Sequence, residues 1–128
     1  MPRNDDPEIG DDVVLWRAIY KGWVEKNPDG TEEIQSWAFR HPTDEVSANI
    51  ATETTLDQFN GWFSPTDYRI AEITVGDARN CGNIVCRDTE GGGTSHVLIC
   101  PTLGKAKNKK IKDARKLAGR ARLRPEGA

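Results

Sequence analysis

The sequence predicts an α+β fold, with an antiparallel or mixed β-sheet, an N-terminal hairpin, short helices and a basic amphipathic C-terminal helix packed on the sheet. Runs rich in β-branched and aromatic residues come first, two short apolar runs follow, and small apolar residues at helical spacing come last. Strands with an apolar face need a cover, which the terminal helix can supply. The 128 residues, nine of them aromatic, suffice for one modest core.

The first segments predict the hairpin. Residues 13–24 and 34–39 are rich in strand-forming side chains. Between them, Asn27-Pro28-Asp29-Gly30 has the composition of a tight turn. We therefore expect the two runs to pair with each other.

A short strand and a short helix are expected next. Residues 46–51 follow His41-Pro42, where the proline interrupts pairing, and could form a strand. Thr55 and Gln58 have the spacing of a capping box, in which each side chain satisfies a backbone N–H of the other residue. Asn60-Gly61 can end this helix after one or two turns.

The second half predicts a strand, a helix and two more strands. Residues 68–75 have strand composition, and residues 77–82 resemble a short helix stopped by a glycine. Residues 84–86 and 97–100 are apolar on both faces, as in central strands covered on both sides. The loop 90–95 joins them.

A terminal helix is expected over residues 107–123. Small apolar residues recur at helical spacing and predict the face that packs on the sheet; they are Ile111, Ala114, Ala118 and Ala121. The other faces carry mostly Lys and Arg.

Charge divides the chain in two. Residues 1–104 carry 8 Lys and Arg against 18 Asp and Glu, whereas residues 105–128 carry 10 against 2. Such asymmetry indicates an interacting face or tail. We expect residues 1–12 to form a flexible acidic arm and residues 13–124 to form a single domain that includes the basic helix.

The cations of the terminal helix are the candidate binding residues: Lys105, Lys107, Lys109, Lys110, Lys112, Arg115, Lys116, Arg120, Arg122 and Arg124. Cations along a helix can contact successive phosphates. However, the nine aromatic residues all lie between Trp16 and Tyr68, so stacking side chains are not interleaved with these charges. A solvated basic face that balances an acidic domain is the competing interpretation.

The three cysteines predict buried thiols and no metal site. Cys81, Cys86, His96 and Cys100 are zinc-binding types, but their spacing does not suit one tetrahedral ion. We expect no cofactor. No run approaches the roughly 20 apolar residues of a membrane span, and the acidic first residues are unlike a signal peptide. A cytoplasmic protein without a membrane partner is therefore expected.

His96 is the candidate for acid–base chemistry, because imidazole titrates near neutral pH. Its candidate partners, if the fold brings them near, are Ser36, Arg17, His41, Ser47 and Asp88. A histidine held structurally by a backbone group or a carboxylate is the alternative. The preceding residues 91–95 could cradle a phosphate, but this loop leads into a strand rather than a helix, so a hairpin loop is the favoured interpretation.

Several short motifs resemble a loose group of small uncharacterised bacterial proteins. They are Ser36-Trp37-Ala38-Phe39, Glu45-Val46-Ser47, residues 76–82, Ser95-His96-Val97 and residues 114–118. The resemblance spans about residues 36–122. It implies a bacterial cytoplasmic origin and no particular activity.

Two function classes follow from these observations. In the first, the protein is a binding or accessory component that docks on nucleic acid or an acidic protein partner through its basic helix. In the second, it is a small enzyme acting on a phosphate-bearing or nucleotide-like substrate, with His96 as general acid or base. Arg17 or Arg79 would then be the anion clamp.

Overall fold

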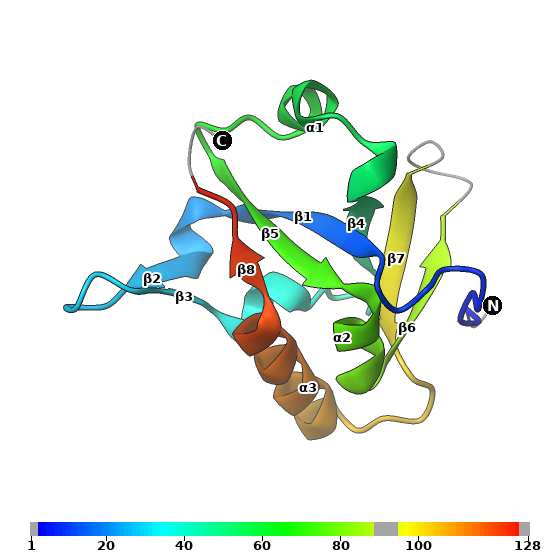
Figure 1. Cartoon of the computed structure of the whole chain (residues 1–128). Helices are drawn as coiled ribbons and strands as arrows, with labels where there is room; N and C mark the ends of the chain where they lie inside the picture. The colour runs from blue at the N-terminus through cyan, green and yellow to red at the C-terminus, as the bar shows by residue number, and fades with distance from the viewer. Residues whose placement is uncertain (1–2, 89–94, 126–128) are drawn as a thin grey trace.

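The computed structural model describes residues 3–88 and 95–125 and has the predicted α+β architecture (Figure 1). The main sheet is antiparallel, with strand order β6-β7-β4-β1-β5-β8. Its strands are β1 (Val14–Tyr20), β4 (Val46–Ile50), β5 (Tyr68–Thr74), β6 (Asn83–Arg87), β7 (His96–Pro101) and β8 (Arg122–Leu123). A separate hairpin consists of β2 (Val24–Lys26) and β3 (Glu32–Ile34).

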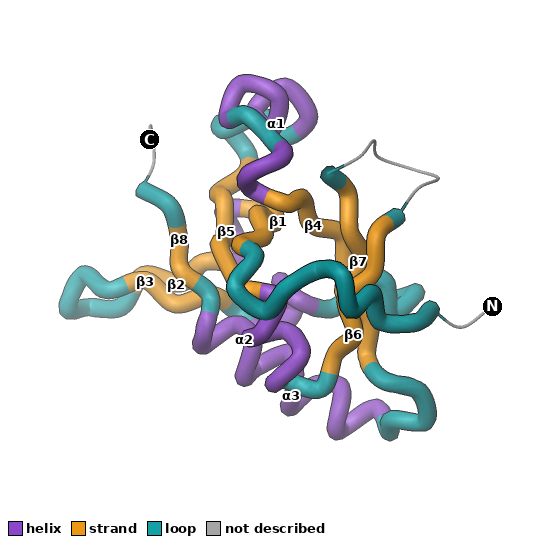
Figure 2. Tube along the Cα trace, turned by 45° about the vertical axis from the view of Figure 1, so that its right-hand side comes forward, coloured by secondary structure: helices purple, strands orange, loops and turns teal. Residues whose placement is uncertain are grey.

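Helices lie on both sides of the sheet. The short helix α1 (Leu56–Trp62) lies on one side, and α2 (Val75–Asn80) and α3 (Lys107–Arg120) lie on the other (Figures 1 and 2). Three 3-10 turns complete the fold: η1 (Lys21–Trp23), η2 (Ser36–Phe39) and η3 (Ala51–Glu53). The main core joins alternate residues of the strands to α2, α3 and η2.

The register assigns residues to the two faces of the sheet. Asn49 lies opposite both Trp16 and His96, so these three side chains share one face. Trp16 contacts Phe59 of α1 edge to face, which identifies this as the α1 face. Leu15 and Arg17, the neighbours of Trp16, therefore project from the opposite face, toward α3.

The predicted hairpin is present but smaller than expected. Its turn is confirmed: the Asn27 N–H donates to the Thr31 carbonyl at 2.8 Å, and Gly30 has a φ of +88°. The expected pairing of 13–24 with 34–39 is confirmed only next to the turn, where Val24 lies opposite Ile34 and the Gln35 N–H donates to the Trp23 carbonyl at 2.9 Å. The rest of the first run is β1, which pairs with β4 and β5 instead.

Residues 36–39 form the 3-10 turn η2 rather than a strand. Ala38 and Phe39 are buried in the main core, and the Arg17 Nε–H donates to the Ala38 carbonyl at 2.6 Å. This carbonyl therefore bonds a side chain instead of a neighbouring strand. Burial against α3 thus overrides the strand propensity of this segment.

The capping box is confirmed. The Gln58 N–H donates to Thr55 Oγ1 at 3.1 Å, and the Thr55 N–H donates to Gln58 Oε1 at 3.0 Å. The helix continues through the expected end at Asn60-Gly61 to Trp62. Helix α2 begins two residues earlier than expected, at Val75, because Thr74 caps it by accepting from the Asp77 N–H at 3.0 Å.

The expectation that 84–86 and 97–100 are both central strands holds for β7 but not for β6, which is the edge of the sheet. The N-terminal segment covers part of this edge. The Asp6 N–H donates to the Val85 carbonyl at 2.9 Å, and the Val85 N–H donates to Asp5 Oδ1 at 2.9 Å. These bonds occupy main-chain groups of Val85 that an edge strand would otherwise leave unpaired.

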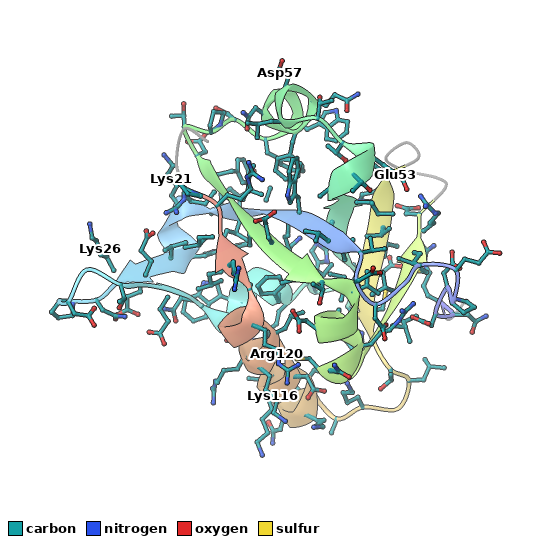
Figure 3. The ribbon with its side chains drawn as sticks, in the orientation of Figure 1. Lys21, Lys26, Glu53, Asp57, Lys116 and Arg120 are labelled. Carbon is teal, nitrogen blue, oxygen red and sulfur yellow. The ribbon has the colours of Figure 1, made fainter. Side chains whose placement is uncertain are left out.

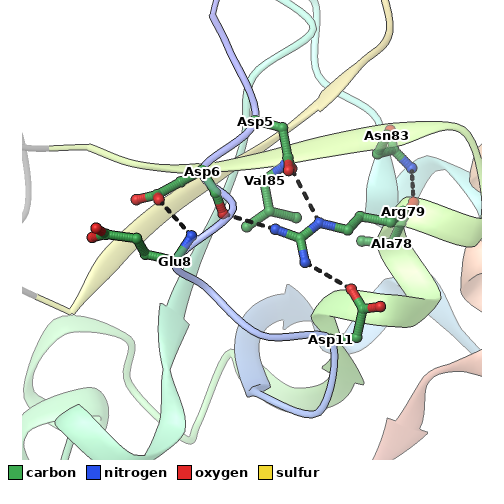
Figure 4. A network of polar contacts seen from close by, with 8 residues as sticks. All are labelled: Asp5, Asp6, Glu8, Asp11, Ala78, Arg79, Asn83 and Val85. Carbon is green, nitrogen blue, oxygen red and sulfur yellow. Dashed lines mark hydrogen bonds and ion pairs between the residues drawn. The ribbon is translucent and has the colours of Figure 1, made fainter.

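The acidic segment predicted as a flexible arm contacts the domain. Ile9 is 3% exposed and belongs to the main core. The guanidinium of Arg79 binds Asp5 Oδ1 at 3.1 Å, Asp11 Oδ1 at 2.7 Å and the Asp6 carbonyl at 2.8 Å (Figure 4). Acidic residues of this segment thus neutralise a cation of α2. The domain boundary at residue 12 stays a prediction.

We expect Ile9→Ala to lower the free energy of unfolding by about 2–5 kcal/mol, because the substitution leaves a cavity in the core. Urea denaturation monitored by tryptophan fluorescence measures the change. Ile9→Val is the matched control and should cost only about 0.5–1.5 kcal/mol. A loss from Ile9→Ala no larger than that of an ordinary surface substitution, about 0.5 kcal/mol, would show that the segment does not support the core.

Candidate nucleic-acid interface

Helix α3 packs through part of the predicted stripe, since Ala114 and Ala118 are buried in the main core. Its buried residues are Asp113, Ala114, Leu117 and Ala118. Ile111 and Ala121, the two ends of the predicted stripe, are half-buried, and Ala121 follows the last residue of the helix, which ends at Arg120 rather than at 123. The packed face thus includes Leu117, which is 1% exposed and belongs to the main core, and Asp113, which has buried polar partners.

Asp113 belongs to a buried ion pair that fastens the start of α3. The Lys105 ammonium lies 2.6 Å from Asp113 Oδ2, and the two side chains are 9% and 6% exposed. Lys105 also donates to the Gly82 carbonyl, and Lys109 lies 3.1 Å from Asp113 Oδ1. Burial raises the pKa of Asp113, but hydrogen bonds from Lys105 and Lys109 outweigh it, so the pKa lies below its ordinary value.

Gly82 is required at this junction. Its φ of +76° favours glycine, and a Cβ at this position would lie 2.6 Å from Asp113 Oδ2. The residue that ends α2 thus also makes room for the ion pair of α3. Lys105, predicted as a binding cation, is buried here and serves the fold.

The ten predicted binding cations fall into two groups. Five lie near carboxylates: Lys105 and Lys109 at Asp113, Lys110 at Asp44, Arg120 at Asp77 and Arg124 at Glu72. The other five have no ion-pair partner within residues 3–88 and 95–125: Lys107, Lys112, Arg115, Lys116 and Arg122. Half of the predicted set is therefore available to a ligand.

Three of the unpaired cations form one surface, which we call the outer face of α3: Lys112, Arg115 and Lys116. All three are exposed, and they lie three and four residues apart, which places them beside one another on a helix. Figure 3 shows Lys116 at the outer side of α3, away from the sheet. This face can present several cations to a polyanion at once.

A cleft of about 570 Å³ adjoins the first half of α3. We call it the Trp37 cleft; its lining residues include Trp37, Arg40, His41, Asn83, Lys107 and Lys110. It lies between η2, the chain that follows it, and the start of α3. Trp37 is 46% exposed, although its neighbours Ala38 and Phe39 are buried.

The Trp37 cleft brings an aromatic residue and basic residues together, although the sequence keeps them apart. The aromatic residues precede the basic helix in the chain, so the sequence shows no interleaving of stacking and charged side chains. The fold nevertheless brings Trp37 to the same cleft as Lys107 and Lys110, because η2 packs under α3. The motif Ser36-Trp37-Ala38-Phe39 draws attention to this segment in the sequence. Its distance from the basic helix along the chain gives no sign that the two lie side by side.

Two cleft residues can recognise polar groups. The Thr43 N–H donates to His41 Nδ1 at 3.2 Å, so the neutral ring carries its proton on Nε2. Asn83 Nδ2 donates to the carbonyls of Ala78 and Cys81 at 3.1 and 3.2 Å. The neutral histidine therefore offers a donor, and Asn83 keeps its Oδ1 as an acceptor.

The three candidate catalytic residues are not brought together. Ser36 lies in η2, and Arg17 projects toward η2 and α3, whereas His96 is on the α1 face. Arg17 is buried, and its Nη1–H donates to the Ser47 carbonyl at 2.8 Å in addition to the bond to Ala38. Burial lowers the pKa of Arg17 to about 10, which leaves it charged at neutral pH. Arg17 supports η2.

His96 has a carboxylate neighbour. Its Nδ1 lies 2.9 Å from Asp88 Oδ2, and the two side chains are 15% and 12% exposed. Beside it, Asn49 Nδ2 donates to Ser95 Oγ at 3.0 Å. The carboxylate lies close to the ring, but the buried Nδ1 has no hydrogen-bond partner within the described residues, so the contact becomes an ion pair only when the ring is protonated.

The cysteines are buried and are divided between two clusters. Cys81 lies in the main core, whereas Cys86 and Cys100 pack with Leu98 on the α1 face. Burial raises the pKa of Cys100 to about 12, so this thiol is unreactive at neutral pH. No group of three metal-binding side chains occurs in the described chain. The expectation that the fold does not need a metal stays a prediction. The phosphate-binding loop is a separate hypothesis, and its residues 91–94 lie outside the described residues.

No protein-family model, curated protein or solved structure matches the chain. Across the described segments, no helix combines the length and apolar character needed to cross a membrane.

Proposed function

We propose that this protein binds nucleic acid through the outer face of α3 and serves as a small binding or accessory component. The observation that carries the proposal is the presence of Lys112, Arg115 and Lys116 on one exposed face, without carboxylate partners in the described chain. Phosphates spaced along a strand can bind these cations and release their counterions, which favours association.

The acidic remainder of the molecule would orient such a ligand. The β2-β3 hairpin carries Glu25, Glu32 and Glu33, and residues 1–104 together have a net charge of −10. A polyanion is repelled by these surfaces and attracted to α3. The overall negative charge is therefore compatible with a local binding face.

Nucleic acid is favoured over an acidic protein because Trp37 shares its cleft with Lys107 and Lys110, which belong to the same helix as the outer face. An indole ring can stack on a base, whereas a run of carboxylates has no planar group to match it. The three buried free thiols suit a reducing cytoplasm, and the resemblance described above suggests a bacterial one.

The proposal is tested by binding of the full chain to three polyanions at low salt: oligothymidylate, a DNA duplex of the same length, and polyglutamate. We expect both nucleic acids to bind more tightly than polyglutamate, because they offer phosphates in register. Preferential binding of polyglutamate would indicate an acidic protein partner instead. No binding of either nucleic acid would contradict the proposal.

The enzyme alternative has one supporting observation, the Asp88 carboxylate at His96 Nδ1. This geometry leaves Nε2 as the reactive nitrogen of the ring. However, the proposed anion clamps are engaged elsewhere: Arg17 bonds the Ala38 and Ser47 carbonyls, and Arg79 binds the N-terminal segment. We therefore rank this candidate second.

His96→Ala separates the two roles. If His96 is structural, the variant should lose about 1 kcal/mol of unfolding free energy, as for a partly buried polar contact. Phosphate release from nucleoside triphosphates should then be unchanged per folded molecule. A folded variant that loses phosphate release shown by the parent protein would instead make His96 catalytic.

A further inference from the structure

We infer that the Trp37 cleft holds an unpaired base, so that the protein prefers single-stranded to duplex nucleic acid. This inference rests on the proposed function, since it assigns the ligand class of the same interface. It adds a second binding element to the charges of α3, namely a stacking platform with its own pocket.

The Trp37 side chain is exposed, whereas the backbone on either side of it is held in the core. The flanking Ala38 and Phe39 are 0% and 5% exposed, and Arg17 bonds the Ala38 carbonyl from within the core. The Arg40 N–H also donates to the Trp37 carbonyl at 3.3 Å. Because the backbone that carries Trp37 is already fixed, stacking of a base on the indole need not order the chain around it.

The charges of the cleft favour an anionic ligand. Two carboxylates line it, but Asp44 lies 2.6 Å from Lys110, and Asp113 lies 2.6 Å from Lys105. Arg40 and Lys107 line the same cleft, and neither has an ion-pair partner among the described residues. These two cations can therefore bind the phosphates on either side of a stacked base.

The size and polar groups of the cleft also suit a base. Its volume of about 570 Å³ lies within the range of small-molecule sites. His41 Nε2–H is available as a donor and Asn83 Oδ1 as an acceptor, as the polar edge of a base requires. Lys107 belongs to the same helix as the outer face, so one strand can contact both elements.

A duplex cannot use this cleft without being opened. Its bases are paired and stacked on one another, so their planar faces are not available to an indole ring. Single-stranded bases are free to turn toward the protein. Duplex DNA should therefore bind through the outer face of α3 alone.

Trp62 provides a matched control. It is 51% exposed, close to the 46% of Trp37, but it lies in α1 on the opposite side of the sheet (Figure 1). Replacing either indole removes the same surface area from the molecule. Only Trp37 should affect binding.

The experiment measures the affinity of the full chain, Trp37→Ala, Trp37→Phe and Trp62→Ala for oligothymidylate and for a duplex of equal length. We expect Trp37→Ala to weaken single-strand binding roughly 5- to 150-fold, the range for loss of one stacked base, and to leave duplex binding unchanged. Trp37→Phe should retain part of the affinity, and Trp62→Ala all of it. Thermal melts establish that each variant is folded.

The outcomes separate the inference from the proposed function. Equal affinity for single strand and duplex, both unaffected by Trp37→Ala, would overturn the inference while leaving binding by α3 intact. Absence of binding to both would overturn the two together. Binding of thymidine monophosphate to the cleft, with no preference for the oligomer, would also overturn the assignment to a strand.

Discussion

Replacing Asp113 by Asn is expected to lower the free energy of unfolding by about 3–5 kcal/mol, the usual cost of removing one partner of a buried ion pair. The Lys105 side chain is 9% exposed. In the variant its ammonium would keep the hydrogen bond to the Gly82 carbonyl but lose the ion pair with the Asp113 carboxylate. A buried charge without a counterion is unstable, so the start of α3 would detach or Lys105 would lose its proton.

Two variants control for this interpretation. Lys109→Met removes a 53% exposed partner of the same carboxylate and should cost no more than about 1 kcal/mol. The double variant Lys105→Met with Asp113→Leu removes both buried charges and should be closer to the wild type than Asp113→Asn. Urea denaturation gives the free energies. The single variants Lys105→Met and Asp113→Leu complete the comparison. A double variant whose loss of unfolding free energy equals the sum of the two single losses would show that the two charges do not interact.

The pH dependence of stability follows from the lowered pKa of Asp113. A carboxyl whose pKa is lower in the folded than in the unfolded state stabilises the fold above its unfolded value, about pH 4, where it is ionised in both states. This contribution is lost as the pH falls through the folded-state pKa. Wild type and Asp113→Asn should therefore differ most near neutral pH and converge in acid.

The second large effect is on binding. We expect Lys112→Glu combined with Lys116→Glu to weaken nucleic-acid binding about 10- to 100-fold near 0.1 M salt, because two phosphate contacts are lost. Both residues are exposed, and neither belongs to the buried face of α3, so the fold should be unaffected. Fluorescence anisotropy of a labelled oligonucleotide measures the affinity.

The control is Lys21→Glu with Lys26→Glu, which changes the net charge by the same amount on exposed residues elsewhere. Lys21 and Lys26 lie far from Lys116 in Figure 3, near β1 and the β2-β3 hairpin. This pair should reduce affinity only weakly. Lys109 and Lys110 are less suitable for the test, since both already lie within 3.1 Å of a carboxylate.

Local chemistry explains which parts of the fold could be predicted. The capping box at Thr55 and Gln58, the turn at Asn27–Gly30 and the basic helix all depend on residues close together in the chain. The strand partners do not. Strand β1 pairs with β4 and β5 rather than with the next apolar segment, because that segment is buried under α3.

Long-range contacts explain what the sequence could not place. The sequence shows that Lys105 is charged but not that it is buried beside Asp113. Its burial depends on the Gly82 carbonyl, which follows α2 and is distant in the chain. Ile9 lies among acidic residues, which obscure its place in the core. Trp37 and the basic helix are separated by about half of the chain, and the packing of η2 against α3 brings them together.

The most direct test of binding by α3 is the salt dependence of affinity for oligothymidylate, compared between the wild type and the Lys112→Glu, Lys116→Glu variant. The logarithm of the binding constant should fall linearly with the logarithm of salt concentration. For the variant the slope should be shallower by about 1.4, or about 0.7 for each lost phosphate contact. Equal slopes and equal affinities for the two proteins would contradict the account, because the outer face of α3 would then make no ionic contact with the strand.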